Sequence, residues 1–550
     1  RLVQTDDLGR VYSTPRVRYQ ADYENERRWL GWDLLCGVVG PGHPLWERLL
    51  RNGVRADDLA WFRDHPCPPD VVGINHYLTS DRFLHERPEL FPAHTRGGNG
   101  RDTYADVEAV RVLDPPTDGL APLLREAWRR YGRPVAVTEA HLGCSREEQL
   151  RWRHEVWRIA KDARAAGADV RAVTVWALFG SYDWNSLLTR ISGHYEPGAF
   201  DLRGSEPRPT ALAGLIQQLA AGHEPEFDPV FASPGWWHRP DRLLHALSEE
   251  PRACGAPAPH RSHEARLRRT RSGPPLLVTG PTGTLGRAVG RRCEQRGLPF
   301  RLLTRGEMDI CCGDSVARVL DELRPWAVVN TAGYVRVDDA EHEPDRCYRE
   351  NSDGPGVLAR ACADDGVRLL TFSSDLVFDG ERSVPYVESD AVHPLNVYGL
   401  SKARAEASVL EHNPLALVVR TSAFFGPWDP HNFLTIALRE LAAGREFVAA
   451  GDSVVSPTYV PDLVNACLDL LVDGERGLWH LANAGDGVSW ARFAREGARC
   501  ADVDTGTLRV VSRDAIGWVA ARPAYSVLGS ERAVLLPSLE NALERYVEQV

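Results

Sequence analysis

The segment LLVTGPTGTLG, residues 276–286, decides the fold of the second half of this chain. Its apolar start, residues 276–278, has the length of a buried parallel strand, and an amphipathic segment follows the last glycine. Gly280, Gly283 and Gly286 lie between the two. Glycines at this spacing permit a tight turn, bring a pyrophosphate close to the backbone and let the helix pack on the strand. The segment therefore predicts a strand, a glycine turn and a helix whose N-terminus holds the pyrophosphate of a dinucleotide.

The residue after the next predicted strand indicates which dinucleotide binds. That strand, Phe300–Thr304, ends at Arg305, where an NAD-specific fold carries Asp or Glu for the ribose hydroxyls. Arginine there favours a 2′-phosphate, so the sequence predicts NADP, with NAD as the other cofactor and an ordinary surface arginine as the alternative interpretation. The predicted cofactor contacts are Gly280, Thr282, Gly283, Thr284, Leu285, Gly286, Arg305, Asp309, Ile310, Asn330, Thr331, Ala332, Tyr398 and Lys402.

Tyr398 and Lys402 stand four residues apart, which places them on one face of a helix. Carbonyl reduction needs a proton donor, and a phenol with a pKa near 10 needs a neighbouring cation to act near neutral pH. Apart from Lys161, Lys402 is the only lysine among 65 basic residues. Its presence in so arginine-rich a chain indicates a position that needs a compact ammonium and not a guanidinium. We predict that Tyr398, Lys402 and Ser374 are catalytic; the simpler alternative is an exposed helix pair.

Length and composition limit the class of protein. The 550 residues predict two to four globular domains, and 43% apolar content is ample for their cores. A net charge of −11 argues against a nucleic-acid partner. Apolar runs of membrane-spanning length and a leader are absent from the sequence, so we expect a cytoplasmic protein without a membrane partner. The 11 scattered cysteines predict reduced thiols and no metal site. Because the chain begins at Arg1 and its only methionine is Met308, we expect a piece of a longer protein.

Three regions follow from the pattern along the chain. Residues 1–225 alternate helical stretches, at 23–35 and 146–166, with short apolar strands at 71–75, 135–138 and 172–178, which predicts an α/β layer. Residues 226–273 are rich in Pro, Arg and His and predict a linker with a helical piece at Arg239–Ser248. Residues 274–550 resume the alternation, with strands expected near Leu276, Phe300, Ala327, Val367 and Leu415. The fold class is therefore α/β, with a Rossmann fold and a small substrate domain in the last region.

Several motifs of the last region, taken together, resemble the extended short-chain dehydrogenases and, more narrowly, the dTDP-4-dehydrorhamnose reductases. FSSDLVFDG at 372–380 is similar to S-T-D-Y-V-F-D-G, with Ser374 at the position of the catalytic threonine, and NTAGYVRVDDAE at 330–341 matches N-A-A-A-Y-T-x-V-D-x-A-E. RTSAFFG, SPTYVPDL, GLWHLAN and RPAYSVL follow in the family's order, from Arg420, Ser456, Gly477 and Arg522.

This resemblance implies NADPH-dependent reduction of a nucleotide-linked 4-keto-6-deoxyhexose, with Asp375, Phe424 and Asn432 contacting the substrate and a homodimer as the assembly. One departure concerns the sugar. The family's R-T-x-W motif places a tryptophan against the deoxysugar, whereas this chain has Ala423 followed by two phenylalanines. We therefore expect an enlarged sugar pocket and leave the particular sugar open.

The first region resembles the C-terminal part of a family-1 glycoside hydrolase, a partial (β/α)8 (TIM) barrel. The motifs are GINHYLTS at 73–80, VTEAHLG at 137–143 and VWALFGSYDWN at 175–185. The resemblance makes Glu139 the nucleophile, with Tyr77 as its hydrogen-bond partner. It makes Trp176 and Trp184 the sugar platform, with Asp183 where the family uses Glu to hold sugar hydroxyls. The simpler interpretation is a strand-end carboxylate and a core aromatic.

The departures in this region argue against hydrolysis. Ala140 and His76 replace family residues, and the sequence contains no N-E-P motif to supply the second carboxylic acid that a retaining glycosidase needs. Motifs of the late strands appear by Gly73, so about half of a barrel is missing. Two alternatives remain open: a glycoside hydrolase in a longer chain with an accessory reductase-like domain, or a catalytically silent regulator that binds sugar nucleotides.

Overall fold

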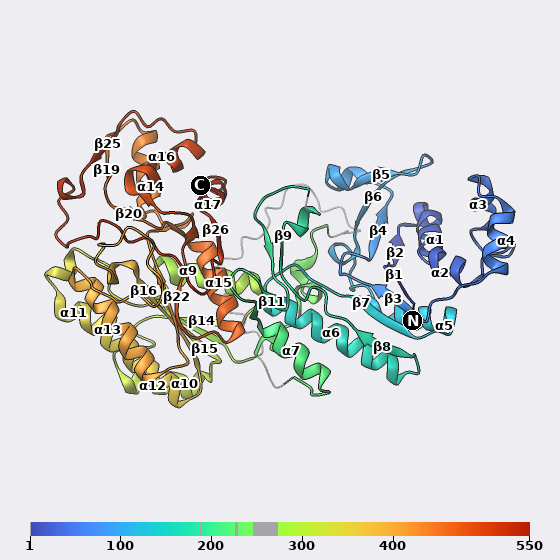
Figure 1. Ribbon diagram of the computed structural model, residues 1–550, viewed down its shortest axis with the longest axis horizontal. Helices are drawn as coiled ribbons and strands as arrows, with labels where there is room; N and C mark the ends of the chain where they lie inside the picture. The colour runs from blue at the N-terminus through green and yellow to red at the C-terminus, as the bar shows by residue number, and fades with distance from the viewer. Residues whose placement is uncertain (1, 188, 226–228, 246–272, 550) are drawn as a thin grey trace, which may run out of the picture. The chain divides into compact units, whose positions relative to one another are not determined.

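The computed structural model describes residues 2–187, 189–225, 229–245 and 273–549. Contacts divide them into two compact units (Figure 1). The described residues of the first unit are 2–178, 212–225 and 234–245. Those of the second are 179–187, 189–211, 229–233 and 273–549. Each unit has its own sheet and its own core.

The first unit is built on a parallel sheet in the order β1 (Val3–Asp7), β3 (Val71–Asn75), β7 (Val135–Glu139) and β8 (Val170–Val173). The predicted strand at 71–75 is confirmed, whereas the one expected at 172–178 begins two residues earlier and ends at Val173. Among the described residues the sheet has four strands and is open, so a partial barrel stays a prediction.

Helices and a second small sheet complete the first unit. The sheet is β2 (Val11–Ser13), β4 (Arg82–His85), β6 (Thr103–Glu108) and β5 (Arg96–Gly98), in that order. The helices are α1 (Arg18–Arg27), α2 (Leu30–Leu35), α3 (Trp46–Arg51), α4 (Ala56–Asp64), α5 (Leu120–Tyr131), α6 (Arg146–Ala165) and α7 (Ala211–Ala220). The helix expected at 23–35 is thus divided at Trp29, whose buried indole Nε1 donates to Glu126.

The second unit contains the predicted Rossmann sheet. Six parallel strands run in the order β14 (Phe300–Leu303), β13 (Leu276–Thr279), β15 (Ala327–Asn330), β16 (Arg368–Ser374), β17 (Leu417–Thr421) and β22 (Gly477–His480). Strands β13, β15 and β17 are buried along their whole length, as expected when helices cover both faces of a sheet. The strand order reverses at β13, and ligands of such folds bind where it reverses, beyond the carboxyl ends of the strands.

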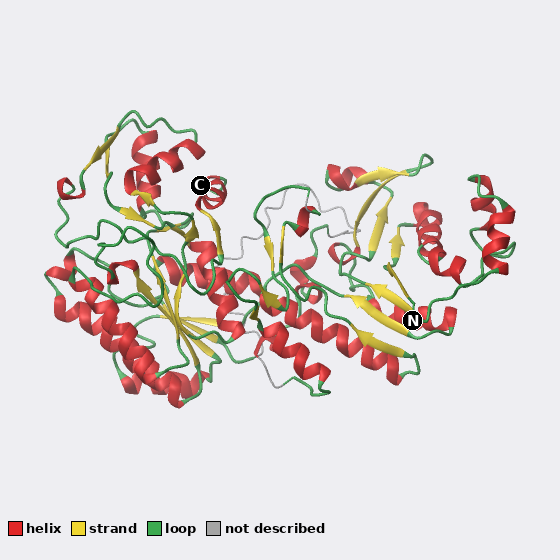
Figure 2. Cartoon of the chain, viewed as in Figure 1, coloured by secondary structure: helices red, strands yellow, loops and turns green. Residues whose placement is uncertain are grey.

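Helices lie on both faces of this sheet (Figure 2). One group contains α9 (Thr284–Arg296) and α15 (Val460–Asp473), which pack together, and the other contains α10 (Gly313–Leu323), α12 (Gly354–Asp364) and α13 (Val397–His412). The short helix α11 (Pro344–Tyr348) precedes α12. Because α13 packs on α12 and on β16, it holds its first turn at the carboxyl end of the sheet.

The C-terminal residues form a smaller layer beside the sheet. Its helices are α14 (Phe433–Ala442), α16 (Trp490–Cys500) and α17 (Leu539–Val547). Its strands pair as β18 (Phe424–Phe425) with β21 (Thr458–Tyr459), β19 (Phe447–Ala450) with β25 (Leu508–Val511), β20 (Val454–Val455) with β24 (Val488–Ser489), and β23 (Asn483–Ala484) with β26 (Leu536–Ser538). Phe425, Phe493 and Tyr546 pack edge to face in its core.

The segment 179–211 corrects the domain boundary expected near residue 225. It contains the short strands β9 (Ser181–Tyr182), β10 (Tyr195–Glu196), β11 (Phe200–Asp201) and β12 (Arg208–Pro209), and it belongs to the second unit. The physical reason is ionic: Arg208 binds Asp473 at 3.0 Å and Glu475 at 3.0 Å. Arg203 donates to the backbone oxygen of Leu535 at 2.8 Å.

The predicted linker lies only partly within the described residues. Residues 229–245 form three short 3-10 turns, the last at Pro240–Arg242. In the first unit, Trp237 is buried and its indole nitrogen donates to Glu155 at 2.9 Å, so this stretch is packed. The helical piece expected at 239–248 is a single turn as far as residue 245, and the rest lies outside the described residues.

Candidate active site

The glycine turn has the conformation that its sequence predicts. Gly280 has φ +67°, which favours glycine, and a Cβ there would lie 2.9 Å from the backbone of Thr331. A Cβ on Gly286 would lie 2.2 Å from the carbonyl oxygen of Gly280, so glycine is needed for the helix to pack on the strand. The protein's own packing therefore explains the first and third glycines.

Gly283 differs from its two neighbours. It caps α9, and the nearest atom that a Cβ would meet is the Gly280 oxygen at 3.5 Å, an ordinary contact. No contact among the described residues requires glycine there. Gly283 lies at the N-terminus of α9, where free N–H groups and the helix dipole bind anions. The turn therefore fits a pyrophosphate that approaches the backbone at Gly283.

Arg305 follows β14, as predicted, and its side chain is mostly exposed. Its guanidinium lies 3.2 Å from Glu350 and 3.5 Å from Asp309, both of which hold its pKa above the ordinary value. Asp309 accepts a hydrogen bond from the Cys311 N–H at 3.0 Å, and the hydrogen bond lowers the pKa of its carboxyl. An exposed cation held by two carboxylates can bind a phosphate by changing partners.

Tyr398 and Lys402 meet as the four-residue spacing predicts. Asn396 caps α13 by accepting from the Gly399 N–H at 2.7 Å, and this starts the helix one residue before Tyr398. The Lys402 Nζ lies 5.7 Å from the centre of the Tyr398 ring and donates to the Phe372 carbonyl at 3.3 Å. Burial lowers the pKa of Lys402 to about 8 and raises the pKa of Tyr398. At neutral pH the pair therefore holds one ammonium and one neutral phenol.

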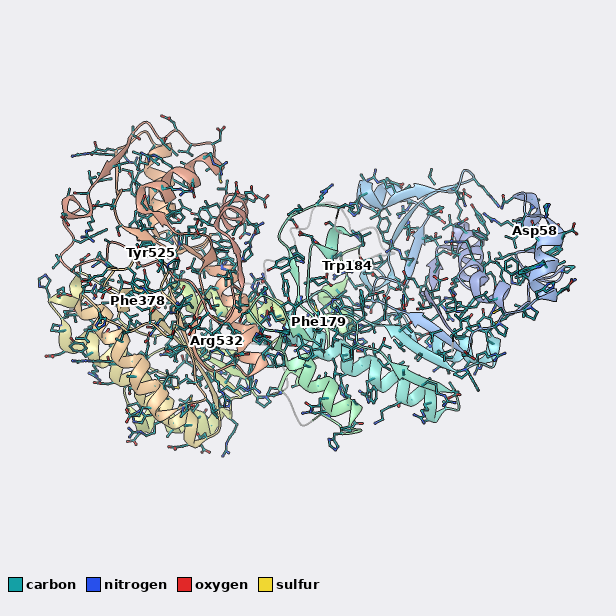
Figure 3. The ribbon with its side chains drawn as sticks, in the orientation of Figure 1. Asp58, Phe179, Trp184, Phe378, Tyr525 and Arg532 are labelled. Atoms are coloured by element: carbon teal, nitrogen blue, oxygen red, sulfur yellow. The ribbon has the colours of Figure 1, made fainter. Side chains whose placement is uncertain are left out.

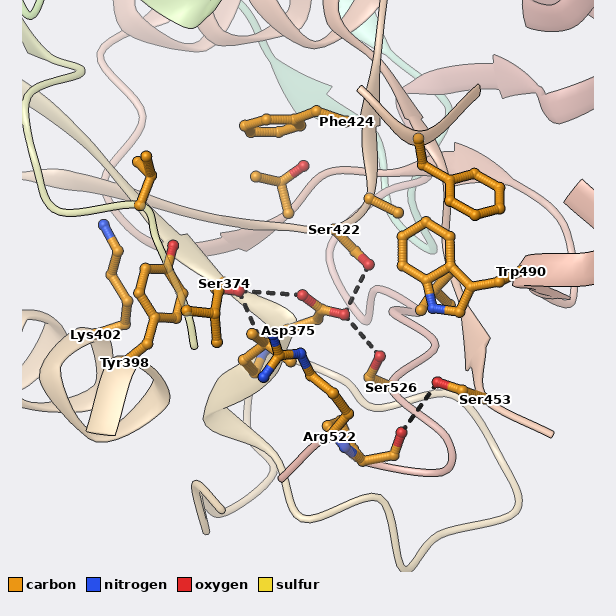
Figure 4. A pocket seen from close by; sticks show the side chains of 18 of the residues that line it. Ser374, Asp375, Tyr398, Lys402, Ser422, Phe424, Ser453, Trp490, Arg522 and Ser526 are labelled. Atoms are coloured by element: carbon orange, nitrogen blue, oxygen red, sulfur yellow. Dashed lines mark hydrogen bonds between the residues drawn. The ribbon is translucent and has the colours of Figure 1, made fainter. Parts of the chain in front are cut away.

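Ser374 ends β16 and connects Tyr398 with a buried carboxylate. An interaction with the Ser374 side chain favours the ionised form of Tyr398, and the Ser374 hydroxyl donates its hydrogen to Asp375 Oδ1 at 3.1 Å. The other Asp375 oxygen accepts from Ser422 at 2.7 Å and from Ser526 at 2.6 Å (Figure 4). Burial raises the pKa of Asp375 despite these hydrogen bonds.

A cavity of about 560 Å³ contains this cluster. Figure 4 shows Tyr398 and Lys402 on one side of it, Trp490 on the other and Phe424 across from Asp375. The cavity runs from the glycine turn to the C-terminal layer. Its lining includes Leu285, Asn330, Thr331, Ala332, Ser373, Ser374, Asp375, Tyr398, Lys402, Thr421, Ser422, Phe424, Phe433, Ser453, Trp490, Trp518, Arg522 and Ser526.

Two lining hydroxyls indicate that the cavity takes a polar ligand. Ser373 Oγ and Thr421 Oγ1 are buried and have no hydrogen-bond partner among the described residues. Both belong to strands at the carboxyl edge of the sheet, β16 and β17. Buried polar groups without partners cost free energy, so a ligand with hydroxyl or phosphate oxygens fits this cavity.

Asn432 does not line the cavity, in contrast to the substrate contact that the resemblance implies. Its side-chain oxygen accepts from the Thr435 N–H at 3.0 Å, and its amide donates to the Asp429 carbonyl at 2.7 Å. These contacts cap α14 and use up the amide. Thr284, predicted to touch the cofactor, likewise donates its hydroxyl to Asp429 at 2.8 Å. The first turn of α9 is thereby fixed to the loop before α14.

Ser422, Ser526 and Arg522 are among the lining residues that the sequence analysis did not name as site residues. Ser422 directly follows the end of β17, where strand-end side chains of a Rossmann sheet gather, and this position could have identified it. Arg522 lies in a loop and pairs with Asp338 at 3.2 Å. Arg522 and Ser526 belong to the RPAYSVL motif, but they are far along the chain from Ser374, so local spacing did not place them in the same site.

In the first unit, Tyr77 and Glu139 are in contact. The Tyr77 hydroxyl donates to the Glu139 carboxylate, which is the pairing that the resemblance implies. Glu139 ends β7, and Trp176 follows β8 in the same unit. Thr138 and Asn75 are also hydrogen-bonded at this end of the sheet, at 2.8 Å.

Asp183 and Trp184 belong to the second unit, so the predicted sugar residues of the first region are divided between the two units. Trp184 is labelled in Figure 3. The Asp183 carboxylate accepts from the Ser192 hydroxyl at 2.7 Å and from the His194 N–H at 3.0 Å. It therefore closes its own loop, and the hydrogen bond from Ser192 lowers its pKa.

Two further observations concern the described residues only. Among them, no helix is long and apolar enough to cross a membrane. No group of three or more His, Cys, Asp or Glu side chains in those ranges is arranged to hold a metal ion.

Comparison with known proteins gives one family match. The family described as RmlD substrate binding domain matches residues 275–550. A protein named dTDP-4-dehydrorhamnose reductase from Mycolicibacterium smegmatis is 36% identical over 261 residues, which are 47% of this chain and 79% of that protein. A dTDP-4-keto-6-deoxy-D-glucose reductase from Streptomyces niveus is 35% identical over 257 residues, 46% of this chain and 88% of that protein.

The chain is also similar in sequence to a protein of solved structure. A dTDP-4-dehydrorhamnose reductase from Bacillus anthracis in complex with NADP is 31% identical, with a TM-score of 0.47. The match covers 50% of this chain and 99% of that one.

Proposed function

Through residues 275–550 the chain belongs to the RmlD substrate binding domain family, and from this premise we propose that it reduces a nucleotide-linked 4-keto-6-deoxyhexose with NADPH. The relatives reported above are named reductases of two such sugars, so the family supports the reaction class more strongly than the particular sugar. The loss of the tryptophan at position 423 leaves the identity of the sugar open.

One observation carries the proposal: Tyr398, Lys402 and Ser374 line one cavity that also reaches the glycine turn at Leu285. A phenol, an ammonium and a hydroxyl around a carbonyl-sized space are the groups that a ketone reduction needs. A protein that only binds sugar nucleotides does not need a partly buried ammonium whose pKa is lowered by desolvation.

The residues present fit NADPH, and each has a separate task. Gly283 and the N-terminus of α9 would hold the pyrophosphate, and Arg305 would hold the 2′-phosphate. Asn330, Thr331 and Ala332, which line the cavity, would lie beside the nicotinamide ribose, and Lys402 would bind that ribose. When bound, NADPH supplies the hydride that reduces the sugar carbonyl.

The protein's own residues handle the proton. Tyr398 is a neutral phenol at neutral pH and can donate a proton to the carbonyl oxygen, while burial raises its pKa and makes it a weaker acid. The Lys402 ammonium stabilises the phenolate that this step leaves, and Ser374 orients the carbonyl oxygen. Asp375 and Phe424 line the cavity on the substrate side. The cytoplasmic location and the homodimer stay predictions.

A panel of nucleotide-linked 4-keto-6-deoxyhexoses, each offered with NADPH and with NADH, tests the proposal. We expect oxidation of NADPH with at least one member and a lower kcat/KM with NADH. Binding of NADPH without oxidation by any member would favour a silent sugar-nucleotide binder.

For the first unit, the family-1 glycoside hydrolase resemblance stays a prediction, supported by the hydrogen bond between Tyr77 and Glu139. We expect the chain described here not to hydrolyse an aryl β-glucoside. Hydrolysis that is lost in Glu139→Gln would instead assign an activity to this unit.

A further inference from the structure

Asp375 carries a buried carboxyl group to which the proposed mechanism gives no part in handling the proton. Its side chain is 6% exposed, and its two oxygens accept from three serine hydroxyls. Ser374 comes from β16, Ser422 follows β17, and Ser526 comes from the loop before β26. Elements far apart in the sequence thus converge on one carboxyl group, which is hydrogen-bonded to Ser374, a proposed catalytic residue (Figure 4).

The hydroxyl of Ser374 has one hydrogen and two lone pairs. One lone pair accepts from the Leu376 N–H at 3.2 Å, and the hydrogen is donated to Asp375 Oδ1 at 3.1 Å. A hydrogen given to Asp375 cannot also be given to a sugar carbonyl. With Asp375 ionised, Ser374 is therefore turned away from the task that the proposed mechanism gives it.

Protonation of Asp375 reverses this bond. The carboxyl O–H can donate into the second lone pair of Ser374, and the Ser374 hydrogen then becomes available on the cavity side. We infer that Asp375 acts in its protonated form as a positioning residue, which donates to Ser374 and turns the Ser374 hydroxyl toward the sugar carbonyl. The inference rests on the proposed function and assigns to Asp375 a role other than contact with the substrate.

The groups that face Asp375 determine when it is protonated. Burial favours the neutral acid and raises its pKa, whereas the hydrogen bonds from Ser526, Ser422 and Ser374 favour the carboxylate. Tyr398 faces it from α13, and Lys402 lines the same cavity one turn further on. Arg522 faces it from the C-terminal loop, but its guanidinium is shared with Asp338. The pKa of Asp375 therefore lies above that of an ordinary aspartate, and the neutral form is lost as the pH rises through it.

The test uses the whole chain and three variants. In Asp375→Asn, the amide can donate to Ser374 while its oxygen accepts from Ser422 and Ser526, so the orientation is kept without titration. Ser526→Ala removes a hydrogen bond that favours the carboxylate. Ser389→Ala is the matched control, because Ser389 donates to the exposed Glu531 at 2.9 Å outside the cavity.

The kinetic readout is kcat against pH with saturating substrate and NADPH. For the wild type we expect two falls in kcat with rising pH, one from Asp375 and another from Lys402. We expect Asp375→Asn to lose the first fall and to keep the second, and Ser526→Ala to move the first fall to higher pH. Ser389→Ala should match the wild type, and Asp375→Ala should lose about 100-fold in kcat. An Asp375→Asn profile that superimposes on the wild type, or an Asp375→Ala variant with unchanged kcat, would overturn the inference.

A second readout does not depend on activity. The carboxylic-acid C=O band, obtained as the infrared difference between wild type and Asp375→Asn, reports whether Asp375 is protonated. We expect the band to persist above the pH at which an ordinary aspartate, with a pKa of about 3.9, is ionised. A band that vanishes at that ordinary pH would contradict the inference even in an active enzyme. A persistent band in a chain that reduces no sugar nucleotide would instead reject the proposed function.

Discussion

At the scale of single residues, the chemistry depends on how burial changes two pKa values in opposite directions. The Lys402 ammonium and the Tyr398 phenol share one turn of α13, and burial lowers the pKa of the first to about 8 while it raises that of the second. Both shifts arise from desolvation, which disfavours the charged form of either group. The result is a neutral acid beside a cation, the combination that proton donation to a carbonyl oxygen needs.

Tyr398→Phe removes the proton donor and leaves the ring in place. Because general acid catalysis contributes about 10²- to 10⁴-fold, we expect kcat to fall by about three orders of magnitude, and NADPH affinity to stay within about threefold. Stopped-flow oxidation and fluorescence titration of NADPH measure the two quantities. A phenylalanine variant with wild-type kcat would remove Tyr398 from the mechanism.

The pH dependence tests Lys402. Its ammonium is present below its folded pKa of about 8 and is lost as the pH rises through that value, so wild-type kcat should fall above about pH 8. Lys402→Arg keeps a cation that is not deprotonated in this range. We expect lower activity in this variant, without the fall near pH 8. The same fall in the arginine variant would show that another group titrates there.

At the scale of secondary-structure elements, the glycine turn and α13 follow from local sequence rules. Residue spacing alone predicts that Gly280 and Gly286 allow close packing and that Tyr398 and Lys402 share a face. Residue spacing does not predict that Asn432 lies outside the cavity, because its side chain caps α14. Asp375 is a similar case: Ser526, one of its partners, lies 151 residues further along the chain. Long-range partners of this kind are set by packing, which local periodicity does not report.

Two glycine substitutions separate packing from cofactor binding. Gly286→Ala places a Cβ 2.2 Å from a backbone oxygen, so we expect a loss of about 2 kcal/mol or more in the free energy of unfolding. Gly283→Ala meets nothing closer than 3.5 Å, so it should keep wild-type stability and weaken NADPH binding at least tenfold.

The control for this pair is Gly313→Ala, at the start of α10, where a Cβ would meet nothing within 4 Å. Urea unfolding and NADPH titration should both match the wild type. If Gly283→Ala bound NADPH normally, the pyrophosphate would not approach the turn at this glycine.

At the scale of the whole molecule, sequence motifs and compact units do not coincide. Motifs that resemble one sugar enzyme run from Gly73 to Asn185, yet residues 179–211 belong to the unit that carries the reductase site. Five of the six sheet strands and the glycine turn of that unit could be predicted because each is a local pattern, whereas β22 was not predicted. The attachment of 179–211 could not, because it depends on Arg208 finding carboxylates more than 260 residues away.

Arg208→Ala tests this attachment. The carboxylates of Asp201 and Asp473 are almost fully buried, so removal of their shared partner should lower the free energy of unfolding of the second unit by about 3 kcal/mol. The control is Arg318→Ala, which breaks an exposed pair with Glu322 and should cost less than about 1 kcal/mol. Equal effects in urea unfolding would mean that the buried ion pairs do not hold the segment.

The most direct measurement of the central claim is isotope transfer. The wild-type chain is incubated with a reactive nucleotide-linked 4-keto-6-deoxyhexose and NADPH that carries two deuterium atoms at nicotinamide C4, and the product is examined by mass spectrometry and NMR. We predict one deuterium at C4 of the sugar, with transfer in Tyr398→Phe slower by about three orders of magnitude. A product without deuterium at C4, or transfer that persists unchanged in Tyr398→Phe, would contradict the account.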